Sequence, residues 1–142
     1  MFKEIKLTDE TFELLIKLYE AVGWVAYTEE PEELRKALDN STYLYGFYEE
    51  NELVGFIRGL TDFSSLNYVQ DILVKPNLHN KGVGSKLLQF VKKTYDVRAQ
   101  VLLTDDEPGQ LAYYKKNGYK NTRDLKNIPL NCFVDFKGID LD

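Results

Sequence analysis

The chain has 142 residues, of which 44% are hydrophobic and 29% are charged, and this length fits one domain by the usual prior of about 100–200 residues. Its 18 Lys and Arg against 23 Asp and Glu leave a net charge of −5, which argues against a nucleic-acid partner because phosphate binding needs a basic surface. One cysteine, Cys132, excludes an internal disulfide framework, and one histidine, His79, excludes a zinc site of Cys and His, so we expect no metal. With no signal peptide and no apolar run long enough to span a membrane, we expect a cytoplasmic α/β domain.

The N-terminal half predicts a strand, two helices and a hairpin. Thr8 is a typical N-cap, and Asp9 and Glu10 follow it in the first turn, where the helix dipole favours anions. Apolar residues then recur with a helical period until Gly23, a typical helix end, and Pro31 suits the first position of another helix. The sequence EENE separates two stretches rich in aromatic and β-branched residues, as in a hairpin. The expected elements are a strand at 2–7, helices at 9–22 and 31–39, and hairpin strands at 43–48 and 53–61.

The C-terminal half predicts a β-α-β unit. Residues 68–74 form an apolar strand that ends before Pro76, residues 83–95 have one apolar helical face, and residues 99–104 form the next strand. Because this unit joins parallel strands and the hairpin is antiparallel, we expect an α/β (α+β) fold with a mixed, mostly antiparallel sheet of about six to seven strands and about four helices. The remaining expected elements are a helix at 109–117, ended by Gly118, and strands at 119–123 and 131–136.

The stretch Val74–Leu88 runs from a strand through a glycine-bearing loop into a helix. The first amides of a helix have no internal partner, and the partial positive charge there favours an anion. Gly82 and Gly84 let a ligand approach the backbone closely. Three lysines surround the loop, namely Lys75, Lys81 and Lys86. These features predict a phosphate cradle, with a glycine turn of purely structural use as the alternative.

Two better-known phosphate motifs do not fit this loop. The dinucleotide fingerprint G-x-G-x-x-G requires glycine or alanine where Leu87 stands. The Walker loop requires glycine where His79 stands and Ser or Thr where Lys86 stands. A nucleotide-binding domain of either type is therefore disfavoured.

The order of residues here resembles the acetyl-CoA-binding motif of the GNAT superfamily of N-acetyltransferases, V-x-P-x-x-[QR]-x-x-G-x-G followed by x-x-L-L. The matching positions are Val74, Pro76, His79, Gly82, Gly84, Leu87 and Leu88. His79 departs from the pattern, because Gln or Arg is usual there. The resemblance implies that the backbone of Ile72, Leu73 and Val74 binds the pantetheine arm and that the loop binds the pyrophosphate. The loop residues are His79, Asn80, Lys81, Gly82, Val83, Gly84 and Ser85.

A second segment, Ala112–Tyr119, resembles the GNAT pattern [FLY]-Y-x-K-x-G-[FY]. The matching positions are Tyr113, Tyr114, Lys116, Gly118 and Tyr119. Glu107 stands where the family often has an asparagine. The resemblance implies that Tyr114 protonates the thiolate leaving group, and a phenol of pKa about 10 donates to a thiolate of pKa about 8.5 only when burial or a partner helps. The alternative for Tyr114 is a helix aromatic with its hydroxyl at the surface.

The acceptor side carries weaker signals. Trp24 and Tyr27 follow the first helix, where GNAT proteins build part of the acceptor wall. Glu29 and Glu30 beside them would attract a cationic amine. The alternative for the two aromatic residues is that they fill the core between the helices.

An alkylamine of pKa about 10.4 is protonated at pH 7, so something must take its proton before attack. Asp71 is a candidate base, because a carboxylate within an apolar strand is costly unless it is paired or functional. Asp105 and Asp106 are alternatives, as is a chain of waters. Asp71 could instead pair with a backbone amide or with Arg58.

The residues and the resemblance together predict a single acetyltransferase domain over 1–142. It would move an acetyl group from acetyl-CoA to a primary amine by direct attack, since no activated nucleophile stands out. The acceptor is a small amine or a protein amine, and the late strands within 119–136 would offer a surface for a homodimer. The main alternative is a non-catalytic acyl-CoA-binding or sensing module.

Overall fold

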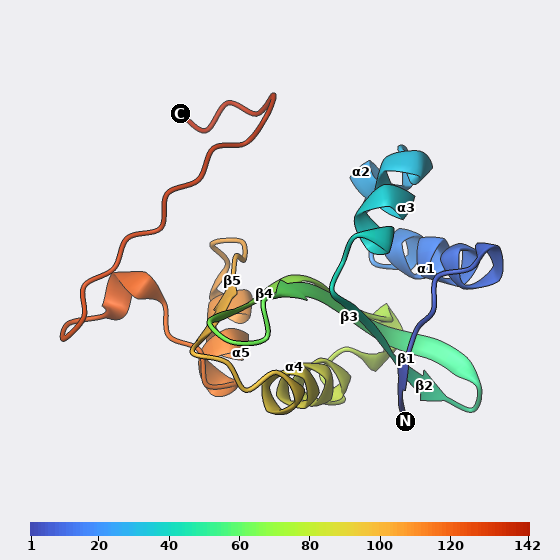
Figure 1. Cartoon of the computed structure of the whole chain (residues 1–142), viewed down its shortest axis with the longest axis horizontal. Coiled ribbons are helices and arrows are strands. Elements are labelled where there is room, and N and C mark those ends of the chain that lie inside the picture. The colour runs from blue at the N-terminus through green and yellow to red at the C-terminus, as the bar shows by residue number, and fades with distance from the viewer. The chain divides into compact units, whose positions relative to one another are not determined.

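The computed structural model describes every residue from Met1 to Asp142, and these fall into two units, Met1–Leu103 and Thr104–Asp142. The first unit holds a five-stranded sheet of order β1-β2-β3-β4-β5 (Figure 1). Its strands are β1 (Phe2–Glu4), β2 (Tyr43–Glu49), β3 (Glu52–Thr61), β4 (Leu66–Val74) and β5 (Ala99–Leu102). Neighbours are antiparallel except for β4 and β5, which are parallel, so the predicted mixed sheet is confirmed.

Three helices precede the hairpin, and the first begins as its sequence predicts. They are α1 (Asp9–Ala21), α2 (Val25–Thr28) and α3 (Pro31–Asp39). Thr8 caps α1 through a capping box in which Thr8 Oγ1 accepts from the Thr11 amide and the Thr11 hydroxyl accepts from the Thr8 amide. The aromatic segment at Val25–Thr28 forms a helical turn of its own, which brings the α-helices to five, where about four were expected.

Helices pack on both faces of the sheet, with α1–α3 on one face and α4 (Val83–Thr94) on the other (Figure 1). β3 runs through the middle and is buried from Leu53 to Gly59. At Gly55 the sheet leaves room for α4, because a Cβ there would lie 2.8 Å from Val83 Cγ1. The core on the other face is built from α1, α3 and the strands, and its fully buried side chains include Leu15, Tyr19, Leu34, Leu38, Phe56 and Leu73. No helix combines the length and the apolar character needed to cross a bilayer.

The second unit differs from the prediction after its helix. It holds α5 (Pro108–Lys116), as expected, and a 3₁₀ turn, η2 (Thr122–Asp124). The strand expected at 119–123 is wrong, because this segment leads into η2, where the Asn121 side chain accepts from the Arg123 amide.

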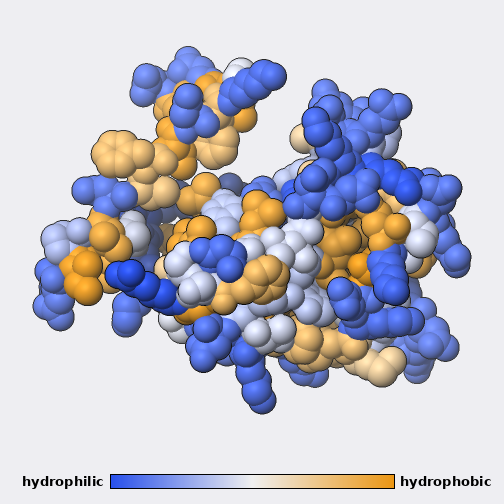
Figure 2. Space-filling model, in the orientation of Figure 1, coloured by the Kyte–Doolittle hydropathy of each residue, from blue (hydrophilic) through white to orange (hydrophobic).

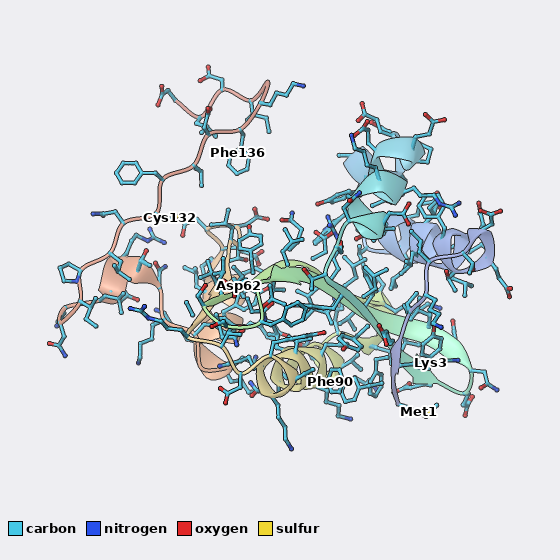
Figure 3. All side chains as sticks on the ribbon, viewed as in Figure 1. Met1, Lys3, Asp62, Phe90, Cys132 and Phe136 are labelled. Carbon is cyan, nitrogen blue, oxygen red and sulfur yellow. The ribbon has the colours of Figure 1, made fainter.

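The strand expected at 131–136 is wrong as well. These residues lie in a stretch without helix or strand, on which Cys132 and Phe136 lie (Figure 3). An apolar extended segment becomes part of a sheet only when a neighbouring strand takes its backbone donors and acceptors, and no such ladder includes this segment. The sheet therefore has five strands instead of about six to seven. Large apolar side chains of this segment and of the residues on either side of it are exposed, namely Ile128, Leu130, Phe133, Val134, Phe136, Ile139 and Leu141.

Candidate active site

The loop between β4 and α4 has the backbone geometry of an anion site. The chain leaves β4, makes the 3₁₀ turn η1 (Pro76–Leu78) and enters α4 through Gly82, whose φ of 83° is in the left-handed region that favours glycine. No side chain caps α4, so its first amides are left for a ligand. A Cβ placed on Gly82 would meet no atom within 4 Å, so the space beside this backbone is open. The chain thus provides uncapped helix amides and room for a phosphate group.

The side chains around the loop are less uniform than the sequence suggests. His79 Nε2 lies 2.9 Å from the Val74 carbonyl oxygen and donates to it, so this ring ties the loop to the end of β4. Lys75 pairs with Glu52, and Lys86 Nζ lies 5.5 Å from the centroid of the Phe47 ring. Lys81 makes no ion pair and is the lysine most available to an anion at the loop.

β4 is paired on both sides over its first half only. Its pairing with β5 runs from Leu66 opposite Ala99 to Val69 opposite Leu102, so Ile72, Leu73 and Val74 have no strand partner on that side. The register between β4 and β3 shifts at Gln70, which is the extra residue of a β-bulge and has no partner on β3.

The backbone direction at the end of β4 decides which groups a ligand can reach. The Lys75 amide donates to the Val54 carbonyl oxygen. The backbone N–H and C=O groups of successive residues in an antiparallel strand point to opposite sides. Those of Leu73 therefore also point to β3, while those of Ile72 and Val74 point to the open side of β4. The Val74 carbonyl already accepts from His79, so the amides of Ile72 and Val74 and the Ile72 carbonyl are left for a ligand.

Asp71 lies in a buried hydrogen-bond network beside the bulge and is 2% exposed. Its Oδ2 accepts from the Tyr19 hydroxyl at 2.7 Å and from Arg58 Nε at 2.5 Å. Its Oδ1 accepts from the Tyr27 hydroxyl at 3.1 Å. Burial, followed by the charge of Asp71, raises the pKa of Tyr19 and that of Tyr27, so both phenols keep the protons that they donate. The pairing with Arg58, which the sequence left open, is present.

Trp24 and Tyr27 form a stacked pair at the surface of this network. Their ring centroids lie 6.0 Å apart with an interplanar angle of 27°, and both rings approach Tyr19, at 6.1 Å and 5.1 Å. Trp24 is 38% exposed, whereas Tyr27 is partly buried and packs against the core. Glu29 and Glu30 are exposed beside them, and hydrophilic residues cover this end of the first unit (Figure 2).

The second motif forms the end of α5 in the other unit. Gly118 has a φ of 91°, its amide donates to the Lys115 carbonyl, and the Tyr119 amide donates to the Tyr114 carbonyl, which together make a Schellman cap. The Tyr114 ring lies 5.0 Å from that of Tyr113 and 6.0 Å from that of Tyr119. Burial, with a smaller effect of these two neighbours, raises the pKa of Tyr114. Tyr114 therefore holds its proton at neutral pH, as a proton donor must.

The sequence predicted no role for Tyr19, which lies within the apolar repeat of the first helix. A tyrosine on the buried face of a helix needs a polar partner for its hydroxyl, and this requirement could have indicated that Tyr19 contacts a group such as Asp71. The alternative bases differ from Asp71 in their surroundings. Asp105 is exposed, and Asp106 Oδ1 accepts from Arg123 at 3.1 Å at the surface.

Comparison with known proteins identifies relatives of this chain in sequence and in structure. Residues 17–128 match the family model described as an acetyltransferase (GNAT) domain. The chain is 25% identical to the uncharacterized N-acetyltransferase ycf52 of Porphyra purpurea, over 83% of this chain and 80% of the relative. It superposes with a TM-score of 0.76 on the GNAT family acetyltransferase SP0256 of Streptococcus pneumoniae TIGR4, at 25% identity and over 95% and 97% of the two chains. It shares its fold with an aminoglycoside 6′-N-acetyltransferase complexed with coenzyme A, at a TM-score of 0.69, 18% identity and 84% of each chain.

Proposed function

Because this chain belongs to the GNAT acetyltransferase family, we propose that it transfers an acetyl group from acetyl-CoA to a primary amine. The observation that carries the proposal is the uncapped start of α4 behind the left-handed Gly82. A protein of the same fold has been solved with coenzyme A, which supports the same cosubstrate here. The family match spans both units, which supports one acetyltransferase domain over residues 1–142.

Two backbone surfaces would hold acetyl-CoA in this proposal. The pyrophosphate lies against the end of the loop of residues 79–85, because the amides of His79 and Lys81 already donate to the Pro76 and Leu78 carbonyls. The uncapped amides at the start of α4, the dipole of this helix and Lys81 supply positive charge there. The pantetheine arm carries amide groups, so it lies along the open side of β4 in the way that an added strand would. Ile72 and Val74 offer the backbone groups for this contact, next to Leu73 in the same strand.

The chemistry that we propose is direct attack of the amine nitrogen on the thioester carbonyl carbon. A C–N bond forms, the C–S bond breaks, the nitrogen loses a proton and the sulfur gains one. Tyr114 is the proposed donor of the proton to sulfur. A covalent enzyme intermediate is disfavoured because Cys132 is exposed and His79, the only histidine, is bonded to the end of β4.

Asp71 stays a prediction as the base. Its carboxylate is buried and accepts three hydrogen bonds, so a proton from the acceptor would reach it through the Tyr27 hydroxyl on Oδ1. A chain of waters remains the alternative acceptor of that proton. The three hydrogen bonds favour the alternative from the sequence, in which Asp71 pairs with Arg58 and does not act as the base.

Tyr27 and Trp24 are the proposed wall of the acceptor site. We expect Tyr27→Ala to raise the acceptor KM by about 2- to 10-fold, as for the loss of one aromatic contact, and to leave coenzyme A affinity unchanged. Steady-state kinetics with varied amine and calorimetry with coenzyme A measure the two effects. Loss of coenzyme A binding in a folded Tyr27→Ala protein would contradict the assignment.

The test of the proposed function has two stages. Calorimetry compares coenzyme A with ATP and NAD, and only coenzyme A is expected to bind. A thiol-release assay with acetyl-CoA then screens polyamines, amino acids, aminoglycosides and peptide N-termini. Coenzyme A binding with no transfer to any amine would favour the acyl-CoA-sensing alternative, and binding of ATP or NAD in its place would overturn the proposal.

A further inference from the structure

A buried chain of polar side chains connects the middle of the sheet to α2. Arg58 on β3 donates from Nε to Asp71 Oδ2 and from Nη1 to Ser41 Oγ, at 2.5 Å and 3.2 Å. Asp71 then receives the hydroxyls of Tyr19 from α1 and Tyr27 from α2. The side chains of Arg58 and Asp71 are 7% and 2% exposed. A buried ion pair adds little net stability, because desolvation offsets the attraction, so its use here is better sought in the geometry that it fixes.

α2 depends on this network of buried polar side chains for its position against the sheet. It is a single turn of four residues with no side-chain cap and no buried residue, and so short a helix is not stable by itself. Val25 is 55% exposed. α2 also packs against α1 and α3, and Tyr27 ties it to the buried network. The Tyr27 hydroxyl donates to Asp71, and its ring lies 5.1 Å from the Tyr19 ring and 6.0 Å from the Arg58 guanidinium.

We propose that Arg58 is a positioning residue of the acceptor site. It holds Asp71 so that Oδ2 accepts from Arg58 and Tyr19 while Oδ1 accepts from Tyr27, and thereby fixes the Trp24–Tyr27 segment. Without the guanidinium, the buried carboxylate lacks its counter-charge and must turn toward water or take up a proton, and either change alters the bond from Tyr27. The effect on catalysis rests on the proposed function, whereas the effect on α2 does not.

Trp24 supplies a readout that needs no substrate. It is the only tryptophan of the chain, and its ring lies 6.0 Å from that of Tyr27 and 6.1 Å from that of Tyr19. Its emission and its quenching by acrylamide therefore report whether α2 stays packed. Displacement of α2 shifts the emission to longer wavelength and increases quenching.

The primary experiment compares Arg58→Met with wild type. We expect a red-shifted, more quenchable Trp24 and an acceptor KM raised by about 10-fold or more, as for the loss of a charge-assisted hydrogen bond, with coenzyme A affinity close to wild type. The matched control is Arg35→Met, which removes an exposed pair with Asp9 at 2.6 Å between α3 and α1. The control should leave Trp24 emission and the acceptor KM unchanged.

Two further variants keep the test decisive if Arg58→Met does not fold. Tyr27→Phe removes only the hydroxyl and keeps the ring, and it should reproduce the Trp24 change and the rise in KM. Arg58→Lys keeps the charge, so its Trp24 fluorescence and its acceptor KM should both lie between those of wild type and Arg58→Met. A folded Arg58→Met or Tyr27→Phe protein with wild-type Trp24 signals, or with changed signals and a wild-type KM, overturns the inference. If the wild-type protein transfers no acetyl group, the proposed function fails, and the Trp24 signals alone then decide the role of Arg58 in holding α2.

Discussion

Replacing Tyr114 with phenylalanine is expected to lower the single-turnover rate of acetyl transfer by about 10²- to 10⁴-fold, the usual worth of a general acid. Coenzyme A affinity should not change, because the proton donation acts only as negative charge grows on the departing sulfur. Single-turnover measurements are needed, since slow product release can hide a change in the chemical step. The matched control is Tyr113→Phe, the neighbouring tyrosine on α5, whose rate should stay near wild type.

The pH dependence gives a second check on Tyr114. Its active form is the protonated phenol, and burial raises its pKa above the ordinary value of about 10. The group therefore stays protonated through pH 10 and loses its proton only above that pH, so the gap between wild type and Tyr114→Phe should persist across the neutral and mildly alkaline range. A wild-type single-turnover rate in the variant would remove Tyr114 from the mechanism.

A valine at Gly84 is expected to weaken coenzyme A binding by about 10- to 100-fold, the loss that accompanies one or more missing hydrogen bonds to a charged group. Gly84 is the second residue of α4, and a branched side chain there would stand between the uncapped amides and a phosphate. Lys93→Val serves as the control, because it adds the same β-branched side chain to the last turn of α4, away from the loop. Unchanged affinity in a folded Gly84→Val protein, measured by calorimetry, would place the phosphate site elsewhere.

Local signals predicted the elements that local chemistry determines. The capping residue Thr8 and the stop at Gly23 give α1 to within one residue of its expected end. Pro31 begins α3, and α4 follows the glycine loop as expected. These features depend on neighbours within one helical turn, so the sequence displays them directly.

Long-range contacts were beyond the reach of the same signals. Tyr19 and Asp71 are 52 positions apart and meet only because α1 packs over β4. Arg58 could be predicted as one of the possible partners of Asp71, since a buried carboxylate needs a counter-charge. The segment at 131–136 shows the opposite error, because its apolar composition favours a strand, yet a strand requires a neighbour that composition does not reveal.

The tail of the second unit also bears on how the protein is prepared. Proteases of the chymotrypsin type accept extended backbone with a large apolar side chain at the cleavage position. Phe133 is 92% exposed and lies in a stretch without helix or strand, and Phe136 follows three residues later. The sheet residues of the first unit are held in hydrogen-bonded ladders and offer no comparable target. We therefore expect a chymotrypsin-type protease to cut first near Phe133 and Phe136, and the intact mass of each preparation checks this before any kinetic comparison of variants.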